Sequence, residues 1–109
     1  MSNLSKAFRA LRKVGYLAYQ NKNFEQIEKM RDKNPGRGTC YYSESDWVRN
    51  EQEKTWELHI NFDGGKCIST GRCGDFEQAA QEILAVFAAH GIKAHWPGSM
   101  SCIIVTDGF

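Results

Sequence analysis

Four cysteines and three histidines have the widest chemical range in this sequence. Five residues separate Cys67 from Cys73, and His59 can approach both if the intervening segments form a hairpin. A structural zinc site needs about four thiolate or imidazole ligands, usually taken from close pairs such as C-x2-C. No such pair occurs, and Cys40 and Cys102 stand far from the others. We therefore predict free, mostly buried thiols, with no bound metal and no other cofactor.

The glycine-rich run at residues 64–75, GGKCISTGRCGD, leads into a predicted helix. Backbone N–H groups and the macrodipole at a helix N-terminus favour a phosphate or carboxylate. The run lacks the G-x-x-x-x-G-K-[ST] pattern of a phosphate-binding loop, and it follows a predicted antiparallel hairpin rather than a parallel strand. A turn followed by the start of a helix explains these glycines, and an anion site is the alternative.

Nucleophilic catalysis requires a serine or cysteine, a histidine base and an orienting acid in one cleft. The predicted strands place His59 and His95 on their solvent-facing sides, and His90 ends a predicted helix. Their spacing selects no reaction, and exposed histidines with a structural role account for all three. An enzyme is therefore the third function that we consider.

Basic and aromatic side chains gather on the first predicted helix. They are Lys6, Arg9, Arg12, Lys13, Tyr16 and Tyr19. Such a helix can bind nucleic acid, because basic groups contact phosphates while aromatic rings stack on bases. It can equally dock on an acidic protein surface, or it can simply be solvated.

Charge is divided unevenly along the chain, although the net charge is only +1. Residues 1–38 hold nine Lys or Arg against three acids, whereas residues 39–109 hold five against ten. The acidic part would repel a long polyanion, so the pattern favours a protein partner over nucleic acid.

Trp47 stands beside Val48 in residues 44–54, which we predict to form a long polar loop. A tryptophan there either folds back onto the core or anchors an interface, because Trp is over-represented among binding hot spots. Both interpretations stay open. The candidate partner-binding residues are thus Lys6, Arg9, Arg12, Lys13, Tyr16 and Trp47.

Helices are predicted where apolar residues recur at spacings of three and four. Residues 3–20 carry one such stripe, and Ser2 or Asn3 can cap its start. A second helix covers residues 23–33 and ends at the Asn-Pro-Gly sequence that follows. The third begins after Asp75 and ends at Gly91, which suits a left-handed C-terminal cap.

The clearest strand is residues 56–62, where apolar and polar side chains alternate strictly. Its predicted buried residues are Trp56, Leu58, Ile60 and Phe62, and its predicted exposed residues are Glu57, His59 and Asn61. Further strands are predicted at 39–43, 66–69, 93–96 and 101–106, the last two as a hairpin. The order α(α)βββαββ predicts an α+β fold with a mostly antiparallel sheet of four to five strands and two main helices on one face.

Composition limits the class of protein. A chain of 109 residues that is 41% hydrophobic and 25% charged is typical of a single globular domain, here residues 1–109. No apolar run approaches the roughly 20 residues that cross a bilayer, and the first residues lack the apolar stretch of a secretory signal. We therefore predict a cytoplasmic protein with reduced thiols and no membrane partner.

Four stretches of sequence carry a further signal. They are LRKVGYLAYQN, TCYYSESDW, TWELHINFDG and ILAVFAAHGIKAHWPGSMSCIIV. Together they resemble a family of small bacterial and phage proteins known only as a domain of unknown function. In that family a cysteine-rich segment commonly follows the first helix, whereas this chain has KNFEQIEKMRDKN there, without a cysteine. The resemblance supports the fold and implies no activity, and no metal or redox role carries over.

These observations predict a non-enzymatic protein-interaction module. The resemblance and the small size imply an accessory protein of a phage or mobile element that binds and modulates a host protein. The alternative is a small nucleic-acid-binding protein that uses the basic helix.

Overall fold

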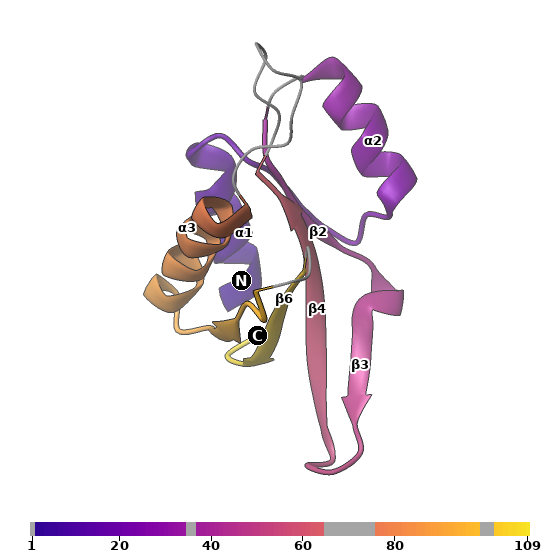
Figure 1. The fold of residues 1–109 in the computed structure, drawn as a ribbon, viewed down its shortest axis with the longest axis vertical. Coiled ribbons are helices and arrows are strands. Elements are labelled where there is room, and N and C mark those ends of the chain that lie inside the picture. The colour runs from indigo at the N-terminus through magenta and orange to yellow at the C-terminus, as the bar shows by residue number, and fades with distance from the viewer. Residues whose placement is uncertain (1, 35–36, 65–75, 99–101) are drawn as a thin grey trace.

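A computed structural model of the chain describes residues 2–34, 37–64, 76–98 and 102–109. In these ranges it contains three α-helices, six strands and one turn of 3-10 helix, Glu44–Asp46 (Figure 1). The helices are α1 (Asn3–Lys13), α2 (Phe24–Lys33) and α3 (Phe76–Ala89). The strands are β1 (Leu17–Gln20), β2 (Thr39–Tyr42), β3 (Trp47–Asn50), β4 (Thr55–Asp63), β5 (Lys93–His95) and β6 (Cys102–Asp107). The α+β class is confirmed.

The described strands form one sheet with the order β1-β2-β4-β6-β5, and β3 pairs with β4. β2 and β3 pair with successive parts of β4, at residues 61–63 and 55–58. Every pairing is antiparallel except that of β1 with β2, so the sheet is mostly antiparallel, as predicted. β1 and β3 are additional to the predicted order. The predicted strand at residues 66–69 lies outside the described ranges.

The first helix ends earlier than predicted. α1 stops at Lys13, and Gly15 then adopts a φ of +109°, which suits glycine and ends a helix. β1 follows, and the Leu17 N–H donates to the carbonyl oxygen of Gly38 on the way into β2. The prediction of a helix to residue 20 was wrong. Ala18 is buried in β1, and its position in the sequence also fits the helical spacing of the apolar residues of α1, so this spacing continues past the end of the helix.

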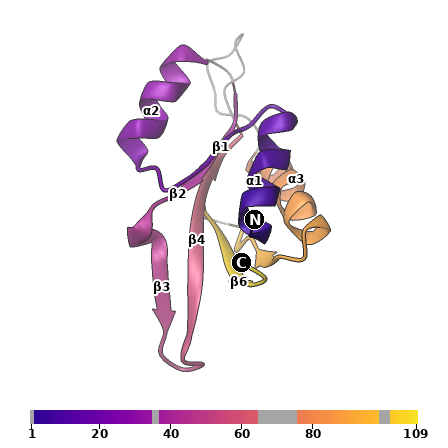
Figure 2. The ribbon, with the colours of Figure 1, turned by 180° about the vertical axis from the view of Figure 1, so that it is seen from behind.

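The helices α1 and α3 lie together on one face of the sheet, as predicted (Figures 1 and 2). The ring of Phe8 stacks on Phe87 with centroids 6.2 Å apart and meets Tyr42 edge-on at 5.7 Å. α3 ends where predicted, since Gly91 has a φ of +75°. The described part of the chain has no helix long and apolar enough to cross a membrane.

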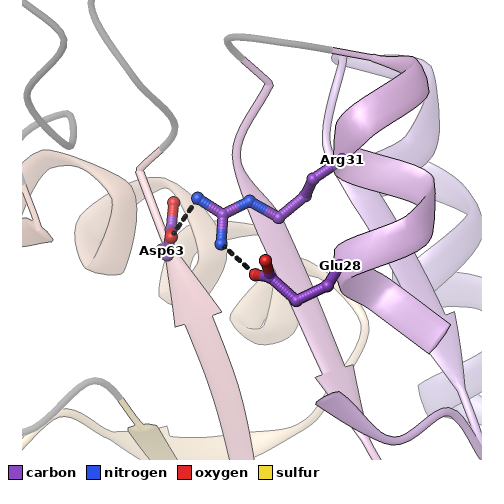
Figure 3. Close-up of polar contacts among 3 residues, drawn as sticks. All are labelled: Glu28, Arg31 and Asp63. Atoms are coloured by element: carbon purple, nitrogen blue, oxygen red, sulfur yellow. Dashed lines mark hydrogen bonds and ion pairs between the residues drawn. The ribbon is translucent and has the colours of Figure 1, made fainter. Parts of the chain in front are cut away.

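The helix α2 forms where predicted, but it lies on the opposite face of the sheet (Figures 1 and 2). A capping box starts it, because the side chains of Asn23 and Gln26 each accept a hydrogen bond from the other's N–H at 2.9 Å. The Arg31 guanidinium lies 2.9 Å from Glu28 Oε1 and 3.0 Å from Asp63 Oδ2 (Figure 3). This bridge ties α2 to the end of β4.

Residues 44–54 form a short helical turn, a strand and a tight connection where a polar loop is predicted. β3 runs antiparallel to β4, and the connection closes on Asn50, whose Oδ1 accepts from the N–H groups of Gln52 and Glu53. The prediction was wrong because the mostly polar side chains of this hairpin give no alternating apolar signal. We call residues 47–57 the hairpin arm, which projects beyond the rest of the sheet (Figure 1).

The hairpin arm exposes one residue that is predicted to be buried. Leu58, Ile60 and Phe62 are at most 2% exposed, as predicted, whereas Trp56 on the same face of β4 is 52% exposed. β6 pairs with β4 only from Leu58 onward, and α1 and α3 lie over that part of the sheet. Trp56 therefore lies beyond the core. Glu57, His59 and Asn61 alternate with these residues along β4, face the opposite side of the sheet and are half-buried.

Candidate protein-interaction surface

A shallow apolar groove opens where the hairpin arm meets the end of β6 and the residues after it. Its volume is about 710 Å³. Its lining residues are Trp47, Thr55, Trp56, Thr106, Asp107 and Phe109. Trp56 and Phe109 are 52% and 38% exposed, so two of its three rings present much of their surface to solvent. We call it the aromatic groove. Exposed apolar patches with a polar rim are typical of binding surfaces.

Trp47 forms the inner side of the aromatic groove. It is the first residue of β3, it is half-buried, and it packs against the core. Its ring meets Tyr42 edge-on, with centroids 6.4 Å apart, and lies 5.0 Å from the ring of Phe109. The two interpretations that the sequence leaves open for Trp47 are thus compatible, because the same ring packs on the core and lines the groove.

Phe109 is positioned by the glycine before it. Gly108 has a φ of +85°, and a Cβ atom added there would lie 2.2 Å from the carbonyl oxygen of Gly91. Asn3 Nδ2 donates to the Gly108 carbonyl oxygen at 3.0 Å. A side chain at position 108 would therefore displace the segment that carries Phe109. Sequence reasoning missed Phe109 because this contact joins residues 105 positions apart.

Trp56 forms the outer side of the aromatic groove. Arg49 stands opposite it in the pairing of β3 with β4, and the Arg49 Cζ atom lies 5.6 Å from the centroid of the Trp56 ring. At this distance the electron-rich face of an indole attracts a guanidinium group. Strict alternation in β4 identifies the face of the sheet that carries Trp56, but it does not show where the covering helices end.

The basic residues of α1 form a second exposed surface, which we call the basic surface and define as Lys6, Arg9 and Lys13. All three are exposed, and none forms an ion pair with another described residue. No hydrogen bond or ring contact among the described residues joins Trp47 to them. Trp47 lies on β3 and the three cations lie on α1, so the predicted site residues do not form one contact cluster.

Arg12 has a structural role at the edge of the sheet. Its guanidinium donates to the carbonyl oxygen of Ala18 at 2.8 Å and lies 5.4 Å from the centroid of the Tyr19 ring. β1 is an edge strand, and edge strands expose backbone groups that can pair with another chain. Arg12 covers one of these groups, so it is less available to a partner than the three cations of the basic surface.

Tyr16 does not belong to the basic surface. It is 8% exposed and lies in the core, because the chain leaves α1 before Tyr16 and turns toward β1. Its hydroxyl donates to Glu82 Oε2 on α3. Burial, and next this carboxylate, raise the pKa of Tyr16. The placement of Tyr16 on the exposed face of the first helix is therefore wrong, and its burial argues against contact with a partner.

The structure bears on only part of the predictions about free thiols and about metal binding. Cys67, Cys73 and most of the glycine-rich run lie outside the described residues. Among the residues that are described, no three His, Cys, Asp or Glu side chains gather in a way that could hold a metal ion. Cys40 and Cys102 are free and buried, and burial raises the pKa of both thiols. A raised pKa keeps a thiol protonated and weakly nucleophilic.

The three histidines occupy separate places. His59 Nε2 lies 3.8 Å from a Glu57 carboxylate oxygen, and the His90 Nδ1 atom lies 2.9 Å from the carbonyl oxygen of Val86. His95 is an exposed residue of β5. In the described ranges no hydrogen bond joins a histidine to a hydroxyl or thiol group, so no nucleophile and base are brought together there.

The match to a family model covers almost the whole chain. Residues 1–108 match the model described as "Domain of unknown function (DUF6891)". No curated protein and no solved structure matches the chain. The matched residues include all of the aromatic groove except Phe109. The chain therefore belongs to the DUF6891 family.

Proposed function

We propose that this chain is a non-enzymatic protein-interaction module that docks a partner protein on the aromatic groove. One observation carries the proposal. Trp56 is 52% exposed at an apolar groove, although it shares a face of β4 with three fully or almost fully buried residues. A large exposed ring forgoes the hydrophobic stabilisation that burial would give, and tryptophan is among the residues most enriched at binding hot spots.

The surroundings of the groove support docking. Trp47 is held by Tyr42 and the core, and Gly108 and Asn3 position the segment that carries Phe109. Side chains that are already ordered lose little conformational entropy when a partner binds. Thr55, Thr106 and Asp107 line the groove beside the rings, and a mixture of apolar and polar groups is typical of an interface.

The basic surface is the second candidate. Its exposed cations suit an acidic partner surface, or the phosphates of a nucleic acid. The nucleic-acid alternative also needs free aromatic rings for stacking on bases. Tyr16 is buried and the Tyr19 ring already carries Arg12 on it. We therefore rank docking of a protein on the aromatic groove above binding of nucleic acid by α1.

We also propose that the partner is a host protein in the cytoplasm, and that the module is an accessory protein of a phage or mobile element. The small size of the domain and its family resemblance support this role. The neighbouring genes test it. A position among early phage genes agrees with the role, whereas an operon of metabolic genes would contradict it.

Capture of partners from a nuclease-treated host lysate tests the docking surface. The variants are Trp56→Ala for the aromatic groove and the combined Lys6→Gln, Arg9→Gln and Lys13→Gln for the basic surface. We expect the Trp56 variant to lose a partner that the wild type and the triple variant retain. Retention by the Trp56 variant with loss by the triple variant would move the docking surface to α1.

A further inference from the structure

We infer that the aromatic groove receives a positively charged side chain, lysine or arginine, from the partner protein. The inference rests on the proposed function, because it names the chemistry of the group that the partner inserts. It concerns the combination of rings and a carboxylate that lines the groove. Neither the exposure of Trp56 nor the family match bears on the charge of that group.

The lining of the groove matches a cation more closely than an aliphatic group. Trp47, Trp56 and Phe109 contribute three aromatic rings, and Asp107 contributes a carboxylate. Ring faces attract ammonium and guanidinium groups, and indole does so most strongly. The Asp107 carboxylate accepts one hydrogen bond within the chain, from the Gly108 N–H at 2.9 Å, and an apolar anchor would take water from its remaining acceptor sites without replacing those hydrogen bonds, which is unfavourable. A lysine or arginine contacts the rings with its stem and the carboxylate with its head.

The chain's own side chains show the same preference. Arg49 is placed with its Cζ atom 5.6 Å from the centroid of the Trp56 ring, so one ring of the groove already attracts a guanidinium. Asp107 supplies the carboxylate of the groove lining, and Lys93 stands opposite it in the pairing of β5 with β6. The inference therefore rests on the rings and on the Asp107 carboxylate, and not on the summed charge of the hairpin arm.

Nuclear magnetic resonance of the 15N-labelled full chain tests the inference at constant ionic strength. The probes are the N-acetyl methylamides of lysine, arginine and norleucine; norleucine has a similar aliphatic stem without the charge. The readout is the indole N–H signal of each tryptophan. Trp96 is an internal control, because it packs on Phe62, near the opposite end of β4 from Trp56.

The lysine and arginine probes should shift the Trp56 and Trp47 signals saturably and leave Trp96 in place. Their affinities should exceed that of norleucine by about tenfold, the combined size of a solvent-exposed cation–π contact and an exposed ion pair. Asp107→Asn should reduce this preference at least about threefold. Asp32→Asn, an exposed acid on α2, should leave the preference unchanged.

Equal affinity for norleucine and lysine would overturn the inference, as would the absence of any shift at Trp56. Neither result bears on the proposed function, which depends on whether Trp56→Ala loses its partner. Loss of the partner by Trp56→Ala, together with equal probe affinities, would mean that the groove docks an uncharged group. Retention of the partner would overturn the proposed function, whatever the probes show.

Discussion

The strand β4 passes through two regions of the molecule that differ in what covers them. From Leu58 onward it pairs first with β6 and then, from Asn61, with β2, and α1 and α3 lie over its apolar face. From Thr55 to Glu57 it pairs with β3 in the hairpin arm. The same alternation of side chains runs through both regions, yet Ile60 is fully buried and Trp56 is half exposed.

This difference shows that a period of two in the sequence determines the face on which a side chain lies and leaves its burial open. Burial depends on how far the elements that cover the sheet extend, and those elements come from remote parts of the chain. A two-stranded hairpin has too little core to bury a tryptophan by itself. An aromatic residue that continues an apolar face beyond the core is therefore a candidate for contact with another molecule.

The largest effect should come from the covered region. Ile60→Ala removes a fully buried side chain from the centre of the sheet and should lower the free energy of unfolding by about 2–5 kcal/mol. Urea unfolding measures the change. A loss below about 1 kcal/mol would mean that this end of β4 is no better packed than the arm.

Alkaline pH should also weaken the covered region. Burial raises the pKa of Cys40 in the folded state, so the unfolded chain loses this proton first. The stability associated with Cys40 is complete below the ordinary thiol pKa of about 8.5, and it falls as pH rises above that value, by up to about 1.4 kcal/mol per pH unit. Unfolding measured between pH 7 and 10 should show a shallower decline for Cys40→Ala. An identical slope would show that the Cys40 thiol ionises equally in both states.

The arm should respond differently from the core. Trp56→Ala should lower the free energy of unfolding by less than about 1 kcal/mol, because half of the side chain is in solvent in the folded state. The urea midpoint and the slope of the transition test this expectation. A loss comparable to that of Ile60→Ala would place Trp56 in the core and remove it from the docking surface.

The smallest effect is expected at the basic surface. Replacing Lys6, Arg9 and Lys13 by glutamine keeps good helix formers and removes no ion pair among the described residues. The free energy of unfolding should change by no more than about 0.5 kcal/mol, and the thermal midpoint of unfolding measures this change. A clear rise in stability would reveal repulsion among the three cations, and a clear fall would reveal a structural role for them.

Local signals in the sequence predict the parts of the fold that local physics determines. The second helix follows from Asn23 as its cap, and the end of the third follows from Gly91. The buried face of β4 follows from the alternation of Leu58, Ile60 and Phe62. Each of these signals lies within a few residues of the feature that it predicts.

The sequence did not predict features that depend on remote contacts. β1 pairs with β2 although α2 separates the two strands in the sequence. The apolar residues of β1 also continue the helical spacing of α1, so they gave no signal of a strand. Tyr16 was assigned to an exposed helix face because the first helix was expected to continue past Lys13, whereas Tyr16 is buried. The aromatic groove combines Trp47 and Trp56 of the arm with Phe109, which Asn3 and Gly108 hold in place. Of these three aromatic residues, only Trp47 was a predicted site residue.

The central claim is that the exposed Trp56 ring is the contact point for a partner protein. Hydroxyl-radical footprinting of the tryptophans, read by mass spectrometry, tests it directly in the free chain and in the captured complex. We predict that Trp56 is oxidised faster than Trp47 and Trp96 in the free chain and is protected in the complex. Unchanged oxidation of Trp56 on binding, with protection appearing on α1 instead, would contradict the account.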